Sequence, residues 1–493
     1  MFKKILIANR GEIAVRIMRT CKDMGIRTVA IYSDADTDSL HVRLADEAYP
    51  VGPAEAIQSY LNTEKILEIA KRSEAEAIHP GYGFLAENPE FAEMCEQQGI
   101  TFIGPPSLCM YRVKPKNHAR QLMKMLNIPV VPGSDEPLTY LSPAIWRIHG
   151  GGGYEPLLDS SAERFAQLEE VAESIGYPVI VKPAGGGGGI GMATARNREE
   201  LANAVHDVEE RGKRIFGVSS FYIERLLSGM KHIEFQVLAD KHGTVVHLGE
   251  RDCSIQRRFQ KLIEETPCHI LSPHLRMKMA VAALDIAVAL QYVNALTVEF
   301  FYMPETQEFY FNEVNSRLQV EHCVTELTTG IDIVREQIRI AAGEHLGYSQ
   351  DEINRRGFSL ECRINAEDVS RNFLPCPGTI TGLRLPHGLG LRIDEGVYEG
   401  YKVPLHYDSL LLKLMTWGKT RTEAIARMNR ALDEMRVEGI KTNIPFHQAV
   451  LDDDTFNTGQ YTTDFVAKQN IVQRVRERAR ILGDVPQALA RRI

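Results

Sequence analysis

Two patterns of apolar and polar residues alternate over the first part of the chain. An apolar run at residues 4–8 is followed at residues 9–25 by apolar positions with helical spacing, and a second apolar run occupies residues 27–33. A helical pattern followed by a short apolar run recurs to about residue 112. Strands alternating with helices predict a parallel α/β sheet, so we expect a first domain at residues 1–113.

The remaining chain falls into three further regions. Residues 114–330 mix helical patterns, a glycine loop and strands, and residues 331–450 carry β-like runs closed by a helical pattern. In the extension, residues 451–493, apolar positions at helical spacing alternate with arginines from Asn470 onward. This predicts an exposed amphipathic helix that packs against the body or another subunit.

Composition narrows the class of ligand. The 493 residues carry a net charge of -8, which argues against a nucleic-acid or membrane-surface partner, since either would favour a large cationic field. Eight scattered cysteines lack CxxC spacing, and no apolar run is long enough for a signal peptide or a membrane span. We therefore expect a cytoplasmic protein that binds small molecules.

A lysine-led glycine loop suggests a phosphate site. Lys182 follows an apolar run and precedes five consecutive glycines, residues 185–189. Small residues let backbone N–H groups crowd around anionic oxygens, and the ammonium adds a positive charge. The lysine precedes the glycines, so the loop differs from a Walker P-loop. A second glycine-punctuated stretch, residues 79–88, could be a functional loop or a structural turn.

The strongest chemical signal lies at residues 313–321, where polar and apolar residues alternate. On one strand the polar set would share a face, and Glu313 and Glu321 would stand roughly 26 Å apart. They would then serve separate sites. Just upstream, residues 296–315 read as a hairpin that brings Glu299 opposite Glu313, with Asn315 two residues on. This oxygen-rich set suits Mg²⁺ or Mn²⁺ bound to ATP.

Several of these stretches occur together in a known family. "IANRGEIAVRI", "HPGYGFLAEN", "KPAGGGGG", "ERDCSIQRR", "EVNSRLQVEH" and "ECRINAED" appear in an order and spacing by which the chain resembles biotin carboxylase. The resemblance implies an α/β and α+β multidomain fold with a Rossmann-like domain at residues 1–113 and an ATP-grasp domain at 114–330. It also implies a lid at about 131–226, with an insertion at about 136–164, and a C-terminal biotin carboxylase domain at 331–450.

The resemblance also implies roles for individual residues. ATP would be bound by Lys116, Lys182, Gly185, Gly186, Gly187, Gly188, Gly189, Glu224, Arg225, Leu227, His232 and Gln256. The metal would be held by Glu299, Glu313 and Asn315. Bicarbonate would be bound by Lys261, Arg317, Gln319 and Val320, with Glu321 as general base and Arg363 stabilising the biotin enolate.

The implied reaction is carboxylation of carrier-bound biotin with MgATP and bicarbonate, through carboxyphosphate. It is the first half-reaction of a carboxylase for acetyl-CoA or a similar acyl-CoA. The Met-Lys-Met tripeptide that carries biotin occurs at residues 123–125 and 277–279, but both copies lie in helical patterns. We therefore expect a homodimer, a separate biotin carboxyl carrier protein or domain, and a carboxyltransferase subunit.

Two alternatives stay open at this point. Another ATP-grasp ligase would activate a carboxylate for attack by an amine, although "RLQVEH" and "RDCS" weigh against it. A catalytically weak regulatory or assembly paralogue is suggested by the lid insertion and by Ile190, Phe259 and Cys323, which depart from the family pattern. The matched lysines, glutamates and arginines argue against such decay.

Overall fold

The computed structural model describes residues 1–113, 116–139, 146–149, 153–156, 160–184 and 191–483. Its N-terminal part is a five-stranded sheet in which every strand pair is parallel, ordered β3-β2-β1-β4-β5, as the alternation of apolar runs and helical patterns predicts. The strands are β1 (Lys4–Ile7), β2 (Arg27–Ser33), β3 (Glu47–Gly52), β4 (Ala77–His79) and β5 (Thr101–Phe102). The main helices here are α1 (Gly11–Asp23), α2 (Leu40–Leu44), α3 (Thr63–Arg72), α4 (Pro89–Gln97) and α5 (Ser107–Val113).

A larger antiparallel sheet of eight strands forms the centre of the molecule, ordered β15-β14-β11-β12-β13-β16-β23-β21. Its strands are β11 (Lys231–Ala239), β12 (Val245–Arg257), β13 (Gln260–Thr266), β14 (Asn294–Met303), β15 (Glu308–Asn315), β16 (Phe358–Asn365), β21 (Leu391–Glu395) and β23 (Leu410–Gly418). The sheet crosses the boundary expected near residue 330, because β13 pairs with β16. Helix α9 (Pro273–Ala289) packs on β11 and β12.

Helix α9 begins where its sequence predicts. Ser272 is the N-cap, its side chain accepts a hydrogen bond from the Leu275 N–H, and Pro273 occupies the first turn, where a missing N–H is harmless. The second Met-Lys-Met tripeptide lies inside this helix, and the first lies in α6 (Lys116–Met125). Neither forms the turn of a carrier domain.

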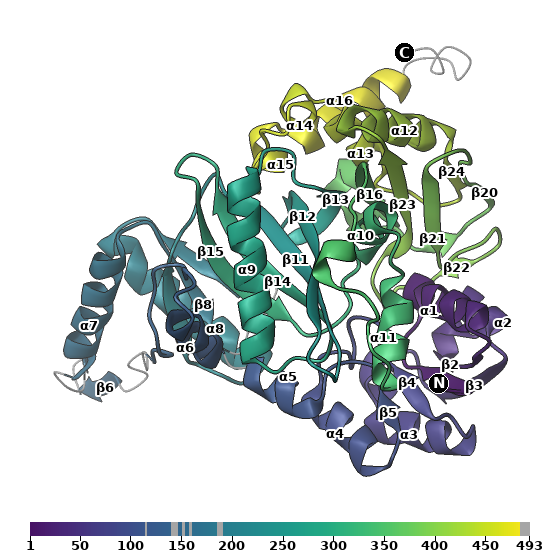
Figure 1. Cartoon of the computed structure of the whole chain (residues 1–493). Helices are drawn as coiled ribbons and strands as arrows, with labels where there is room; N and C mark the ends of the chain where they lie inside the picture. The colour runs from purple at the N-terminus through teal and green to yellow at the C-terminus, as the bar shows by residue number, and fades with distance from the viewer. Residues whose placement is uncertain (114–115, 140–145, 150–152, 157–159, 185–190, 484–493) are drawn as a thin grey trace.

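A smaller unit projects to the left in Figure 1. It contains the three-stranded sheet β10-β8-β9 and a β6–β7 hairpin. Its elements are β6 (Trp146–His149), β7 (Gly153–Pro156), α7 (Ser160–Ile175), β8 (Val179–Pro183), β9 (Ala193–Ala195), α8 (Arg198–Phe216) and β10 (Phe221–Arg225). Apolar side chains from α7, α8 and the three strands give the unit its own core.

The C-terminal part adds short strands and helices around the large sheet. The helices are α10 (His322–Thr329), α11 (Ile333–Ala341), α12 (Arg421–Glu434), α13 (Ile444–Leu451), α14 (Asp454–Asn457), α15 (Phe465–Lys468) and α16 (Ile471–Gly483). In α16, the helix expected in the extension, Ile471 and Val475 are buried in the C-terminal core. This helix therefore packs against its own chain. Within the described residues, no helix combines the length and apolar character needed to cross a bilayer.

The expected strand over residues 313–321 is wrong in its second half. Strand β15 ends at Asn315, and Glu321 is the N-cap of α10. The chain leaves the sheet at Ser316, whose N–H donates to Glu87 Oε1 at 3.1 Å instead of to a neighbouring strand. A side-chain acceptor thus replaces the strand ladder, so the polar residues after Asn315 reach the site through a turn and not along one extended face.

Candidate active site

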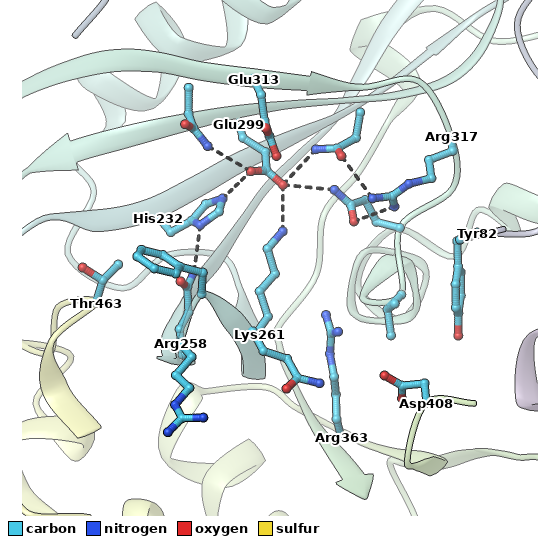
Figure 2. Close-up of a pocket in the computed structure, with 18 of the residues that line it drawn as sticks. Tyr82, His232, Arg258, Lys261, Glu299, Glu313, Arg317, Arg363, Asp408 and Thr463 are labelled. Atoms are coloured by element: carbon cyan, nitrogen blue, oxygen red, sulfur yellow. Dashed lines mark hydrogen bonds and ion pairs between the residues drawn. The ribbon is translucent and has the colours of Figure 1, made fainter. Parts of the chain in front are cut away.

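A cavity of about 1030 Å³ opens between the N-terminal sheet, the large sheet, the small unit and the C-terminal part. This volume lies at the upper end of the range common for small-molecule sites. Among the expected site residues whose side chains are described, all except Glu321 line it, and Glu321 lies behind Lys261 and Arg363. Figure 2 shows His232 and Lys261 pointing towards Glu299, while Tyr82, Arg363 and Asp408 lie around the same cavity.

Glu299 is the most heavily contacted carboxylate of the cavity. Lys261 Nζ lies 2.9 Å from its Oε1, and His232 Nε2 lies 2.8 Å from its Oε2. Three side-chain amides also donate to it: Asn312 at 3.3 Å, Asn315 at 2.9 Å and Gln319 at 3.1 Å. Burial opposes the charge, yet Lys261 and His232 hold the pKa of Glu299 well below its usual range. The carboxylate is therefore ionised.

A row of charged residues crosses four strands at this point. The strand registers place Glu313 opposite Glu299, Glu299 opposite Glu234, and Glu234 opposite Arg251. The expected hairpin is confirmed, with its turn at residues 304–307. No local pattern indicated a role for Glu234 or Arg251, because their partners come from strands distant in sequence. Arg251 is completely buried and donates to Glu234.

Lys261 joins three carboxylates. Its Nζ lies 2.5 Å from Glu234, 2.9 Å from Glu299 and 2.7 Å from Glu321. The separate roles predicted for the two ends of residues 313–321 remain a prediction, but the two places adjoin, because Glu299, from the metal pair, and Glu321 share one ammonium. The turn after Asn315 is the reason, since it folds Glu321 back towards β13.

Glu321 also contacts Arg363. Its second oxygen accepts from Arg363 Nη2 at 2.8 Å, while Arg363 Nε donates to Glu264 at 2.6 Å. Burial opposes ionisation of Glu321, but Lys261 and Arg363 hold its pKa well below the usual range. Glu321 is fully buried and ionised, with a cation on each oxygen. Glu264 had no local sequence signal.

Arg317 lies at the edge of the cavity. Its Nε lies 3.0 Å from Glu87 Oε2, and its other nitrogens donate to Gln319 at 3.0 Å and Asn315 Oδ1 at 3.1 Å. Tyr82, Gly83 and Phe84, from the stretch at residues 79–88, line the same cavity. Of the two possibilities left open for that stretch, the functional loop fits this position. Val320 lines the cavity, and its carbonyl accepts from Lys413 Nζ at 2.9 Å.

The donor set around Glu299 and Glu313 fits a hard divalent cation. Both carboxylates line the cavity, and carboxylate and amide oxygens are the ligands that Mg²⁺ and Mn²⁺ prefer. Asn315 turns its amide nitrogen towards Glu299 and its oxygen towards Arg317. To act as a ligand, Asn315 would therefore have to rotate its amide.

The residues predicted to bind the nucleotide line the cavity from both the small unit and the large sheet. Lys182 Nζ pairs with Glu224 at 2.5 Å, and Gln256 contacts His232 Nδ1 at 2.7 Å. Arg225 and Leu227 line the same wall, beside apolar side chains that local patterns did not reveal: Val131, Ile180, Met192, Met230 and Phe301. The side chain of Lys116 and the loop of Gly185, Gly186, Gly187, Gly188 and Gly189 lie outside the described residues, as does Ile190.

Two departures from the family pattern have ordinary surroundings. Cys323 is fully buried, donates from Sγ to Asp394 at 3.1 Å and accepts from Lys413 at 3.2 Å. Phe259 is 56% exposed at the cavity mouth, in the turn between β12 and β13. The described carboxylates and cations of the site do not depend on either side chain for a hydrogen bond.

Three family models match successive parts of the chain. They are the biotin carboxylase N-terminal domain at residues 1–110, the ATP-binding domain of the carbamoyl-phosphate synthase L chain at 155–349, and the biotin carboxylase C-terminal domain at 361–468. Biotin carboxylase 1 of Bacillus subtilis is 47% identical, with 96% of this chain and 100% of that one aligned. A pyruvate carboxylase subunit of Methanothermobacter thermautotrophicus is 49% identical, with 94% and 90% aligned.

Solved structures agree over the same length. A Campylobacter jejuni biotin carboxylase complex with β-γ-ATP has a TM-score of 0.87 at 43% identity, covering 95% of this chain and 99% of that one. The biotin carboxylase domain dimer of Hydrogenobacter thermophilus 2-oxoglutarate carboxylase, with MgADP, ADP and bicarbonate, has the same TM-score and identity, covering 96% and 98%. The chain therefore belongs to the biotin carboxylase family and is an ATP-dependent ligase of that family.

Proposed function

We propose that this protein carboxylates biotin on a separate carrier, using MgATP and bicarbonate through carboxyphosphate. The observation that carries the proposal is the Lys261 ammonium, which bridges Glu299 on the nucleotide side and Glu321 beside Arg363. Phosphoryl transfer to bicarbonate requires its acceptor and the metal-bound nucleotide at adjacent positions. Lys261 would lie at that junction, which supports the proposal.

The nucleotide would be held by Lys116, Lys182, Gly185, Gly186, Gly187, Gly188, Gly189, Glu224, Arg225, Leu227, His232 and Gln256. Residues of about 131–226 would act as the lid. Glu299, Glu313 and Asn315 would hold Mg²⁺ or Mn²⁺, which when bound offsets negative charge on phosphoryl oxygens. Lys182 already pairs with a carboxylate, so an incoming phosphate replaces one anionic partner by another.

Bicarbonate would be bound by Lys261, Arg317, Gln319 and Val320, with Glu321 accepting its proton. Arg363 would then stabilise the negative oxygen of the biotin enolate after phosphate removes the ureido proton. Lys261 and Arg363 are each shared between carboxylates, so both are already positioned to meet an anion.

We further propose a homodimer that works with a biotin carboxyl carrier protein or domain and a carboxyltransferase subunit. The Hydrogenobacter thermophilus structure is described as a dimer, and the pyruvate carboxylase relative is named as one subunit of an assembly. The final acceptor would be acetyl-CoA or a similar acyl-CoA. Co-purification of the native assembly tests this, because a carboxyltransferase that accepts only a keto acid would overturn the acyl-CoA assignment.

The test of the reaction is ADP release with bicarbonate and free biotin. ADP release should require bicarbonate, rise with biotin and disappear in Glu321→Gln. Glu326→Gln is the matched control, because Glu326 is also buried and ion-paired on α10 but faces Arg16 and Arg392. Folded wild-type protein whose ADP release ignores biotin would overturn the proposal.

A further inference from the structure

Behind Arg363 lie two buried carboxyl groups that the reaction described above does not use. Glu264 on β13 and Glu361 on β16 are both 0% exposed, and the strand register places them directly opposite each other. Opposite residues of an antiparallel pair hold their Cβ atoms about 5 Å apart on one face of the sheet. The two carboxyl groups are therefore close neighbours in an interior of low dielectric.

Their partners differ. Glu264 Oε1 accepts from Arg363 Nε at 2.6 Å. Among the described residues, neither oxygen of Glu361 nor Oε2 of Glu264 has a hydrogen-bond partner. Met415 pairs with Glu361 in the strand register, and it packs with Cys323 and Val324 of α10 in an apolar cluster. Glu361 therefore has an apolar neighbour on this side and no hydrogen-bond donor among the described residues.

Charged groups reach this pair from four elements: Lys261 on β13, Arg363 on β16, Lys413 on β23 and Glu321 at the start of α10. The thiol of Cys323 on α10 also lies nearby. Lys413 pairs with Glu12 at 3.3 Å and lies 3.9 Å from Asp394, so its charge is already shared elsewhere. Arg363 is committed to Glu264 and Glu321.

Two buried carboxylates cannot both ionise beside one another when only one has a cation. We propose that Glu361 is a neutral carboxylic acid that keeps a proton behind the active site, and that Glu264 is the carboxylate that positions Arg363 for biotin. This rests on the proposed function of Arg363. Burial raises the pKa of Glu361 well above its usual value and that of Glu264 only to about 7, which agrees with Glu361 as the group that keeps the proton.

The arrangement has a consequence for the biotin step. When Glu321 accepts a proton from bicarbonate, its pairing with Arg363 weakens, and Glu264 keeps the guanidinium in place. If Glu361 ionised, the surplus negative charge would disfavour the biotin enolate beside Arg363. Activity in the biotin step should therefore fall at high pH, as Glu361 loses its proton.

Infrared spectroscopy tests the proton directly. The carbonyl stretch of a protonated carboxylic acid should be present in the wild-type protein near pH 7.5 and lost in Glu361→Gln. Glu265→Gln is the control, because Glu265 is buried one residue from Glu264 but is engaged by Arg421 and Tyr461. A wild-type protein without a band that Glu361→Gln removes would overturn the proposal, whether or not the protein carboxylates biotin.

Kinetics test the positioning role. Glu264→Gln should lower kcat/KM for biotin by roughly tenfold or more, while ADP release without biotin and the KM for ATP stay within about twofold. Glu361→Gln should retain activity and lose the high-pH decline. The proposal would be overturned if Glu264→Gln lowered ADP release without biotin as much as kcat/KM for biotin. It would also be overturned if the activity of Glu361→Gln still declined at high pH as in the wild type. If Glu264→Gln does not fold, the infrared band and the Glu361→Gln profile still decide.

Discussion

Replacing Lys261 by methionine probes the centre of the site, because it removes one charge while nearly preserving side-chain volume. In the native arrangement the ammonium lies within 3 Å of Glu234, Glu299 and Glu321. Without it, Glu234 keeps Arg251 and Glu321 keeps Arg363. Glu299 keeps His232 and three neutral amides.

The expected loss of stability follows from these remaining contacts. One buried negative charge loses its counterion, and removing one partner of a buried ion pair typically destabilises a protein by about 3–5 kcal/mol. The variant can relieve the loss by binding a proton, and at about 1.4 kcal/mol per unit this corresponds to a rise of roughly two to four pKa units in the carboxylates. We therefore expect a large loss of stability at pH 8 that persists to about pH 5 and shrinks below it, because the rise starts from folded pKa values well below the usual range.

The direction of the pH dependence follows from the wild-type pKa values. Burial opposes ionisation, but Lys261 lowers the pKa of Glu299 and Glu321, so their contribution to stability is present above the unfolded pKa. It is lost only as pH falls through the low folded pKa. In the variant the carboxylates titrate higher, so wild type and variant converge in acid.

Urea unfolding with a metal chelator, at pH 8, 6, 5 and 4, measures this difference. Lys278→Met, at an exposed position on α9, is the control for loss of a lysine. We would abandon the claim that Lys261 compensates buried carboxylates if Lys261→Met lowered the free energy of unfolding by less than about 1 kcal/mol at pH 8. The same holds if the loss were equal at every pH.

Three further changes test other parts of the molecule. Asp36→Asn should lower the free energy of unfolding by about 2 kcal/mol at pH 7. Burial opposes the charge of Asp36, but contacts led by Arg10 lower its pKa to about 2, so the loss should be smaller below pH 4. Thermal unfolding across this pH range checks the prediction. Glu313→Gln should raise the Mg²⁺ concentration for half-maximal ADP release by about tenfold, whereas exposed Glu308→Gln on the same strand should not. Phe259→Gly should stabilise the protein by about 1 kcal/mol in urea unfolding, because Phe259 has a φ of 66°, and Phe259→Ala should give no gain.

The local sequence pattern was enough to predict those helices and strands whose interacting residues lie close together in the sequence. The hairpin that pairs Glu299 with Glu313 follows from alternation on both sides of one turn. Helix α9 follows from a serine cap, a proline and regular apolar spacing. In both cases the interactions that define the element lie within about twenty residues.

The rest of the site depends on which distant strands become neighbours. Period-two alternation continues past Asn315, but it carries no information on where a pairing partner ends, so the turn at Ser316 could not be predicted. Glu234 and Arg251 lie in ordinary strand patterns, and only the register of β11 with β12 and β14 brings them to Lys261. Fixing that register requires the folded sheet.

The low pKa of Glu321 is compatible with a role as general base once the substrate is considered. In the structure two cations stabilise its charge, so it is a weak base in this state. Bicarbonate bound beside Lys261 and Arg317 would add an anion that competes for the same ammonium and repels the Glu321 carboxylate. Both effects raise the pKa of Glu321. The base would therefore gain strength only when its substrate is in place, which would limit futile phosphoryl transfer in an empty site.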